Sequence, residues 1–307
     1  MLEGIRAMYL FNYDEADSIK KRVEDVSPYL RGWTLDKRFN TLRNLNISEI
    51  TNTFCRTDRK IFQTYKGVNY GTSEAMVIGA SIHSVVEEVF DSVVFDAQES
   101  RPIHETLAQL KNSSGIEQQI WIGGKMQGMR NLYSSDAEYV LKLNNLKDIL
   151  REIIDFEVGR FSDPTLNGQV KILDLERFVH GLPLAVSYGK IDVVFRYNGM
   201  LGIGDLKTGR PWKDNWDAKL QMAVYALLLE SEVKREVDWG VAIFPFDSSS
   251  SIKSLRKRPL KDIFGIGDEL RIQALQRLTD VDNMLSSGAP PEICDRCSTR
   301  DLCSRVI

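Results

Sequence analysis

KIDVVFRYNGMLGIGDLKTG, residues 190–209, is the stretch around which the chain is organised. Within it, two apolar runs rich in β-branched residues flank Asn198-Gly199. A two-residue hairpin turn needs a positive φ at both central positions, and Asn followed by Gly is among the strongest short signals for such a turn. The stretch therefore predicts two antiparallel strands joined by a tight turn.

The two-residue turn also fixes which residues face each other across the hairpin: Tyr197 and Met200, Val194 and Ile203, and Asp192 and Asp205. The last pair would hold two carboxylates with Cβ atoms about 5 Å apart, which destabilises a sheet unless a positive charge lies between them. A divalent cation would supply that charge. Alternation along the strand adds Lys207 to the face of Asp205. This patch of Asp, Asp and Lys indicates metal-assisted cleavage of phosphodiester bonds.

A simpler interpretation makes Asp192 and Asp205 solvent-facing residues that Lys207 neutralises, since Asp-x-Lys is a common sequence. The opposite face of the hairpin argues against it. There Gly202 and Gly204 would pair with large apolar residues and weaken the strand, unless something packs closely on them. The pattern favours a functional hairpin and leaves the simpler interpretation open.

The composition is that of a globular protein of one or two domains: 307 residues, 43% hydrophobic and 27% charged. No apolar run approaches the roughly 18 residues needed to span a bilayer, and the N-terminus does not read as a signal peptide. We therefore expect a cytoplasmic protein without a membrane partner. The formal net charge is only -3, so any contact with DNA would depend on local basic patches.

Upstream of the hairpin, apolar residues with helical spacing follow Gly79 and predict an amphipathic helix: Ile82, Val85, Val86, Val89, Phe90, Val93 and Val94. His83 lies in its first turn, at the edge of the apolar stripe. From there its ring can point along the core surface toward a neighbouring sheet. A single histidine at such a position is more often structural than a ligand, so the helix alone leaves its role open.

Around the hairpin, Val170–Val179 alternates like a strand, and a helix is predicted after Asp214 or Asn215, either of which could cap it. Gln221 and Tyr225 stand at i and i+4 on that helix and share one face. A tyrosine at the rim of the core beside a solvated glutamine is the simpler interpretation of this pair.

Beyond that helix, residues 239–244 predict a buried strand, which a right-handed crossover would make parallel to the strand of Asp205. The basic run at residues 255–259 is typical of solvated surface, although beside a nuclease site it could hold phosphate. A further helix is predicted from about Asp268 to Leu285.

The C-terminus carries a second signal, Cys294-x-x-Cys297-x5-Cys303. Three cysteines this close in an intracellular chain favour metal thiolates over disulfides. The remaining cysteine is Cys55, and four thiolates suit either structural zinc or an iron-sulfur cluster. Joining Cys55 to the C-terminus would close a loop of most of the chain and constrain the unfolded state.

In order and spacing, these motifs resemble one known family: Gly79-x-x-x-His83, Gly189-x-x-Asp192, Gly204-Asp205-x-Lys207-Thr208-Gly209, Gln221-x-x-x-Tyr225, and Cys55 with the late cysteine cluster. They are similar to the RecB-like branch of the PD-(D/E)xK nucleases. More narrowly, they resemble the CRISPR-associated exonucleases often called Cas-four, in the long archaeal Csa form. The resemblance runs from about residue 30 to the end, and leaves out the insertion around residues 99–128.

The resemblance implies an α/β (α+β) fold with a PD-(D/E)xK core, a mixed central sheet flanked by helices. On this basis we divide the chain into a helical region (1–165) that carries Cys55 and His83, a nuclease core (166–250), and a C-terminal helix with the cluster-binding segment (251–307). The implied activity is that of a DNA nuclease, usually exonucleolytic, on single-stranded or splayed DNA during acquisition of CRISPR spacers. Other CRISPR adaptation proteins would be its partners.

The family also implies roles for particular residues. Mg²⁺ or Mn²⁺ would be held by His83, Asp192, Asp205 and the Leu206 carbonyl. Lys207 would orient the attacking water and stabilise the transition state, and Gln221 and Tyr225 would position Lys207 or the strand being cut. One [4Fe-4S] cluster would be held by Cys55, Cys294, Cys297 and Cys303.

Two other functions remain compatible with the sequence. The chain could be a non-cutting DNA-binding adaptor of the CRISPR adaptation complex with a structural metal cluster. A more distant alternative is a redox-sensing cluster protein without a nuclease role. Cleavage assays discriminate the first from a nuclease, and four-thiolate ligation by itself does not separate zinc from an iron-sulfur cluster.

Overall fold

The structure, a computed structural model, describes residues 13–36, 38–53, 55–68, 70, 77, 79–83, 135–145, 147–148, 151, 170–181, 183–207, 215–246 and 255–293. The predicted helix after Gly79 is described only as far as His83, and Cys294, Cys297 and Cys303 lie outside the described residues. Within the described ranges, no helix is long and apolar enough to cross a membrane.

The described strands form one mixed sheet in chain order: β1 (Val170–Val179), β2 (Gly189–Tyr197), β3 (Met200–Leu206), β4 (Val237–Phe246) and β5 (Leu255–Gly265). All neighbours are antiparallel except β3 and β4, which are parallel and are connected through α9 (Trp216–Val233). A parallel pair needs such a crossover, because the chain must return to the end of the sheet where the first strand began, and a short turn joins only antiparallel strands. The predicted parallel strand and the mixed α/β class are confirmed.

The central hairpin folds as its turn residues predict. Asn198 and Gly199 have φ angles of 47° and 86°, the left-handed conformation that a tight two-residue turn demands. Val194 pairs with Ile203, so the predicted register is confirmed.

The face of the hairpin that carries the glycines is closely packed. Gly202 pairs with Phe195 on one side and with Trp239 on the other. A Cβ atom on Gly202 would lie 2.0 Å from the Trp239 ring, so no larger residue fits there. The Phe195 and Trp239 rings stack with centroids 5.6 Å apart. The prediction that something packs closely on these glycines is confirmed.

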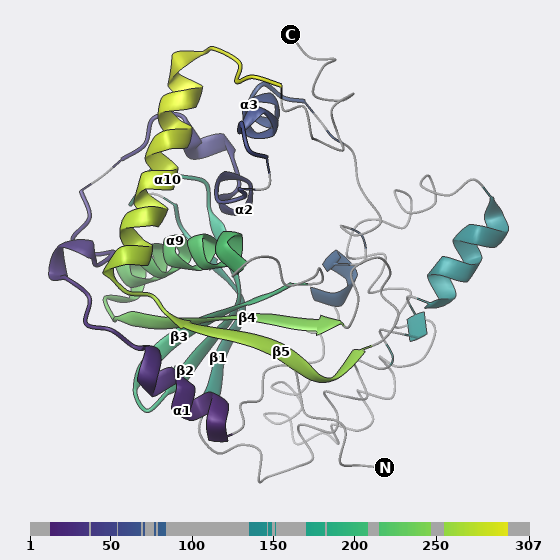
Figure 1. Cartoon of the computed structure of the whole chain (residues 1–307), viewed down its shortest axis with the longest axis horizontal. Helices are drawn as coiled ribbons and strands as arrows, with labels where there is room; N and C mark the ends of the chain where they lie inside the picture. The colour runs from purple at the N-terminus through teal and green to yellow at the C-terminus, as the bar shows by residue number, and fades with distance from the viewer. Residues whose placement is uncertain are drawn as a thin grey trace, which may run out of the picture.

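α9 is buried around most of its circumference. From Ala218 to Glu230 every residue except Lys219 is buried, because the sheet covers one side of the helix and α10 (Asp268–Ser287) packs against another. A helix that is apolar all round is stable only in such a place. Figure 1 shows α9 between the sheet and α10.

The N-terminal segments pack on elements far along the chain. α1 (Tyr13–Arg22) lies along β5, and Figure 1 shows it on the side of the sheet away from α10. The other short elements contact α10: η1 (Pro28–Leu30), η2 (Leu42–Asn44), α2 (Ile47–Ile50) and α3 (Arg59–Tyr65). The start of the chain therefore covers helices near its end.

One local prediction needs correction. Asn215 stands at the N-cap position of α9, but its side chain makes no capping bond because its Nδ2 donates to Asp262 Oδ2 at 2.9 Å. The basic run at residues 255–259 begins β5, where Leu255 pairs with Phe246. Pro259 fits there because β5 is the edge strand of the described sheet, and a proline at an edge removes no interior hydrogen bond.

A buried carboxylate joins α9 to α10. Glu230 and Arg271 are both 0% exposed, and the Arg271 guanidinium donates to both Glu230 oxygens, at 2.8 and 2.9 Å. Its remaining N–H groups donate to the carbonyls of Leu30, Val237 and Ile266. All five guanidinium donors therefore have partners, as a buried arginine requires.

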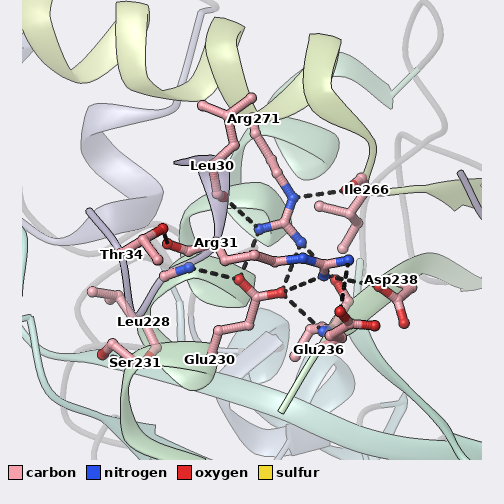
Figure 2. Close-up of polar contacts among 12 residues, drawn as sticks. Leu30, Arg31, Thr34, Leu228, Glu230, Ser231, Glu236, Asp238, Ile266 and Arg271 are labelled. Atoms are coloured by element: carbon pink, nitrogen blue, oxygen red, sulfur yellow. Dashed lines mark hydrogen bonds and ion pairs between the residues drawn. The ribbon is translucent and has the colours of Figure 1, made fainter. Parts of the chain in front are cut away.

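Glu230 also fixes the N-terminal segment, as Figure 2 shows. Arg31 Nη1 donates to Glu230 Oε1 and to Asp238 Oδ1, each at 2.9 Å, and the Gly32 N–H donates to Glu230 Oε2 at 2.8 Å. Burial by itself would raise the pKa of Glu230, but the hydrogen bonds and charge of Arg271 outweigh it and hold the pKa below its ordinary value. The network thus joins four separate segments through one carboxylate.

We expect Arg271→Met to lower the free energy of unfolding by about 3–5 kcal/mol, because it leaves the Glu230 carboxylate buried without its main counter-ion. Urea denaturation measures this loss. Lys21→Ala is the control, since the ion pair of Lys21 with Asp17 lies on the surface and its loss should change stability by less than about 0.5 kcal/mol. Equal stability of the two variants would contradict a structural role for the network.

Candidate active site

Three carboxylates come from three neighbouring strands. Glu176 lies in β1, Asp192 in β2 and Asp205 in β3. The β1–β2 pairing on either side of Glu176 puts this residue opposite Asp192. The β2–β3 pairing continues to Val193 and Gly204, the pair next to Asp192 and Asp205. The sheet thus lines up three acidic side chains across adjacent strands.

His83 lies against two of these carboxylates. Its Nδ1 is 3.2 Å from Glu176 Oε1 and 3.6 Å from Asp192 Oδ1. The potential ligand atoms of the three side chains lie within 4.8 Å of one another. One imidazole nitrogen with carboxylate oxygens is a donor set that suits Mn²⁺, and its carboxylates also suit Mg²⁺. The residues present therefore fit a divalent cation.

Asp192 is held in place by the backbone of the neighbouring strand. The Leu206 N–H donates to Asp192 Oδ2 at 2.6 Å. Burial raises the pKa of Asp192 to about 7, against the opposing charge of His83. The N–H of Leu206 thus has an observed contact in the site, while a ligand role for its carbonyl stays a prediction.

Lys207 reaches the last carboxylate and the helix above it. Its Nζ is 2.6 Å from Asp205 Oδ2 and donates to Gln221 Oε1 at 3.0 Å. Burial would lower the pKa of Lys207, but the charge of Asp205 outweighs it and raises the pKa above its ordinary value. Lys207 therefore stays a cation, and Asp205 faces it. A ligand role for Asp205 stays a prediction.

Gln221 and Tyr225 extend this contact along α9. Gln221 Nε2 lies 3.2 Å from the Tyr225 hydroxyl oxygen, and both side chains are buried. Burial raises the pKa of Tyr225, so the phenol keeps its proton at neutral pH. The interpretation of Gln221 as a solvated residue is wrong, because its amide is occupied on one side by Lys207 and on the other by Tyr225.

Glu176 was missed by sequence reasoning. It is one acid in an alternating strand, and no motif marks it. Its φ of 51° is unusual for a residue other than glycine. Such a conformation costs about 1–3 kcal/mol and persists where contacts over-determine it. Here His83 contacts one carboxylate oxygen and Lys190 forms an ion pair with the other. The positive φ is a backbone feature that no pattern in β1 predicts.

The electrostatics of His83 follow from these neighbours. Burial by itself would lower the pKa of His83, but the charges of Asp192 and Glu176 raise it to about 9. The same contacts act on Glu176: burial would raise its pKa, while hydrogen bonds from His83 and Lys190 hold it below its ordinary value. Without a metal, His83 is therefore protonated at neutral pH and serves as the counter-ion of the acidic row.

A cavity of about 830 Å³ opens on the Lys207 side of the site. Lys207 and Gln221 line one part of it, and Cys55, Lys60 and Trp216 line another. It therefore connects the catalytic lysine predicted from the sequence to the segment that carries α2 and α3.

Cys55 is the one predicted cluster ligand within the described residues. It is partly exposed, and contacts of residues that follow it closely fix its segment. Arg277 binds both Asp58 oxygens, at 2.6 and 2.7 Å, and Arg59 Nη1 donates to the Pro291 carbonyl at 2.5 Å. Pro291 precedes Cys294 by three residues, so the chain leading to the late cysteines returns to the segment of Cys55.

Comparison with known proteins gives one family. Residues 14–305 match the family model described as CRISPR-associated exonuclease Csa1. A search of curated proteins gives no match.

Two solved structures show only distant likeness. A crystal structure from Eubacterium rectale, described as a "putative exonuclease", is 15% identical, covers 87% of this chain and 90% of its own, and has a TM-score of 0.40. The crystal structure of SSO0001 is 13% identical, covers 76% of this chain and 86% of its own, and has a TM-score of 0.24. Likeness at these TM-scores carries no argument about function.

We expect the affinity for Mn²⁺ to rise with pH through about 7 and about 9, the pKa values of Asp192 and His83. A proton on either group removes a ligand atom, so binding must release protons, and fewer are left to release as pH rises. Calorimetric titration in buffers of different ionisation enthalpy counts the protons.

His83→Ala should weaken Mn²⁺ binding and remove the upper part of the pH dependence. His180→Ala is the matched control, because His180 is an exposed histidine after β1. Affinity that does not change with pH, or that is unchanged in His83→Ala, would remove His83 from the metal site.

Proposed function

Because the chain belongs to the CRISPR-associated exonuclease family Csa1, we propose that it is a metal-dependent DNA exonuclease that acts in the acquisition of new CRISPR spacers. The observation that carries the proposal is the group of His83, Glu176 and Asp192, whose ligand atoms lie within 4.8 Å of one another. Carboxylates from adjacent strands repel one another unless a cation joins them. A bound metal ion would compensate this repulsion, which explains why the carboxylates lie together.

The residues of the group divide the work by position. His83, Glu176 and Asp192 would hold the metal ion, and Asp205 and the Leu206 carbonyl are the further ligands predicted from the sequence. When bound, Mg²⁺ or Mn²⁺ polarises a phosphate oxygen and lowers the pKa of water. The N–H of Leu206 keeps the Asp192 carboxylate oriented, with a hydrogen bond of 2.6 Å.

Lys207 supplies the fixed positive charge. It stays protonated, since Asp205 raises its pKa, and its ammonium stabilises the negative charge that develops on the phosphate during cleavage. Gln221 accepts from Lys207 and contacts Tyr225, so α9 fixes the direction of the lysine. Gln221 and Tyr225 are therefore positioning residues in this mechanism.

We expect Lys207→Ala to abolish Mn²⁺- or Mg²⁺-dependent cleavage of DNA, with a loss of at least about 100-fold, because the transition-state charge loses its nearest donor. Asp205→Asn should have a similar effect. Cleavage of end-labelled single-stranded, splayed and duplex DNA measures both variants, and an unchanged melting temperature shows that the fold is intact.

Lys66→Ala is the matched control, since Lys66 is an exposed lysine at the end of α3. It should cleave as the unmodified protein does. If the unmodified protein cleaves none of the three substrates yet binds them, the chain is the non-cutting adaptor of a CRISPR adaptation complex. If Lys207→Ala keeps full activity, the site lies elsewhere.

The cysteines form the second part of the proposal: one [4Fe-4S] cluster held by Cys55, Cys294, Cys297 and Cys303. The contacts of Arg59 with Pro291 and of Arg277 with Asp58 support it, because they bring the segment of Cys55 to the chain that leads into Cys294. Four thiolates suit such a cluster. Its role would be structural, since it would join both ends of the chain.

Cys55→Ala should remove the brown colour, lower the melting temperature and promote aggregation, because the free energy of cluster binding is largely folding free energy. Visible absorption spectra with iron and sulfide analysis of anaerobically purified protein measure the cluster. Stoichiometric zinc without iron would replace the cluster with a zinc site. A full cluster and native stability in Cys55→Ala would exclude Cys55 as a ligand.

A further inference from the structure

Two aromatic rings stand exposed at the end of the β1–β2 pair. Phe178 and Tyr188 are each 60% exposed, and their ring centroids lie 6.0 Å apart with planes inclined at 43°. Exposed aromatic residues scattered singly need no explanation, but two adjacent rings form an apolar patch that water covers at a cost. We call Phe178 and Tyr188 the aromatic pair.

The aromatic pair is linked to the acidic row by one side chain. Lys190 pairs with Phe178 across the two strands, and its Nζ lies 5.7 Å from the Phe178 ring centroid. The same ammonium forms an ion pair with Glu176, whose other oxygen is 3.2 Å from His83. The rings therefore stand beside the proposed metal site, with a lysine between the two.

This combination suits an unpaired nucleic-acid strand. Bases without a partner expose their flat faces, and aromatic side chains accept them by stacking whatever the sequence. A neighbouring lysine attracts the phosphates that join those bases. Bases within a duplex already stack on one another and do not expose their faces, so the aromatic pair should contribute little to the binding of an intact duplex.

A protein partner fits the same surface less well. The centre of a protein interface is depleted of lysine, because burying its ammonium is costly. Here the ammonium of Lys190 lies 5.7 Å from the Phe178 ring centroid, so a partner that covered the rings would also cover this charge. The ion pair of Lys190 with Glu176 also connects the aromatic pair to the proposed site of cleavage.

We propose that the aromatic pair is a stacking platform for an unpaired DNA end, and that it places the phosphate next to the stacked bases at the site formed by His83, Glu176 and Asp192. Lys190 is a positioning residue that holds Glu176 and lies against the Phe178 ring. The inference rests on the proposed function, which supplies DNA as the ligand and the metal site at which the phosphate is placed. A platform of this kind predicts tighter binding of unpaired than of duplex ends.

The test measures binding without cleavage. The full chain carrying Lys207→Ala binds a fluorescein-labelled oligothymidylate in EDTA, and anisotropy gives its Kd. Stacking of one base on an aromatic ring corresponds to about 5- to 150-fold in affinity. We expect Phe178→Ala with Tyr188→Ala to weaken binding by at least about 5-fold, and Phe178→Trp to retain it.

An oligonucleotide of the same length with abasic residues separates stacking from charge. It should bind the Lys207→Ala protein equally well with and without the substitutions at Phe178 and Tyr188, because it keeps the phosphates and lacks the bases. Tyr29→Ala is the control for loss of an exposed aromatic residue elsewhere, since Tyr29 is 85% exposed in η1. It should leave both affinities unchanged.

Several outcomes overturn the platform. One is an unchanged Kd for oligothymidylate after both substitutions, and another is an equal loss on the abasic strand, which would indicate contact with phosphates or a damaged fold. A change in oligomeric mass with unchanged DNA binding would make the surface a protein interface.

The proposed nuclease function fails separately, if the unmodified protein binds DNA through the aromatic pair but cleaves none. Conversely, a protein that cleaves DNA while both substitutions leave its Kd unchanged keeps the nuclease function and loses the platform.

Discussion

The buried carboxylate of Glu230 is the constraint on which the rest of the arrangement depends. A charge with no exposure is tolerated only when every lone pair has a donor, and here Arg271, Arg31 and backbone N–H groups provide them. These donors come from α10, the N-terminal segment and the start of β4. Because Glu230 belongs to α9, the network fixes the helix that also carries Gln221, and so fixes the direction of Lys207.

In the candidate site, unlike at Glu230, several carboxylates are held close to one another. Three carboxylates on adjacent strands repel one another, and the cations His83, Lys190 and Lys207 relieve that repulsion in the absence of a metal. This arrangement is stable enough to fold and still offers ligand atoms to a divalent ion. The backbone of Glu176 carries part of the cost in its positive φ. Local conflicts of this kind are expected at functional sites.

Local patterns predicted the parts of the site that adjoin in sequence. The turn at Asn198 fixes the hairpin, its register sets Asp192 beside Asp205, and helical spacing puts Gln221 and Tyr225 on one face. Each depends on contacts within about thirty residues, for which strand and helix periodicity are sufficient guides. The strand β4 and the helix α10 were predicted for the same reason.

The sequence by itself thus determined the hairpin, the parallel β4 and the motif residues, because periodicity and turn chemistry act locally. Only the tertiary structure decided that Glu176 and Lys190 join His83, that Arg271 binds Glu230, and which side of the sheet the N-terminal segments cover. These contacts link residues far apart in the chain, and one acid or arginine resembles another until the fold brings it to a partner. The missing cap at Asn215 has the same physical cause: a distant carboxylate competes for its side chain.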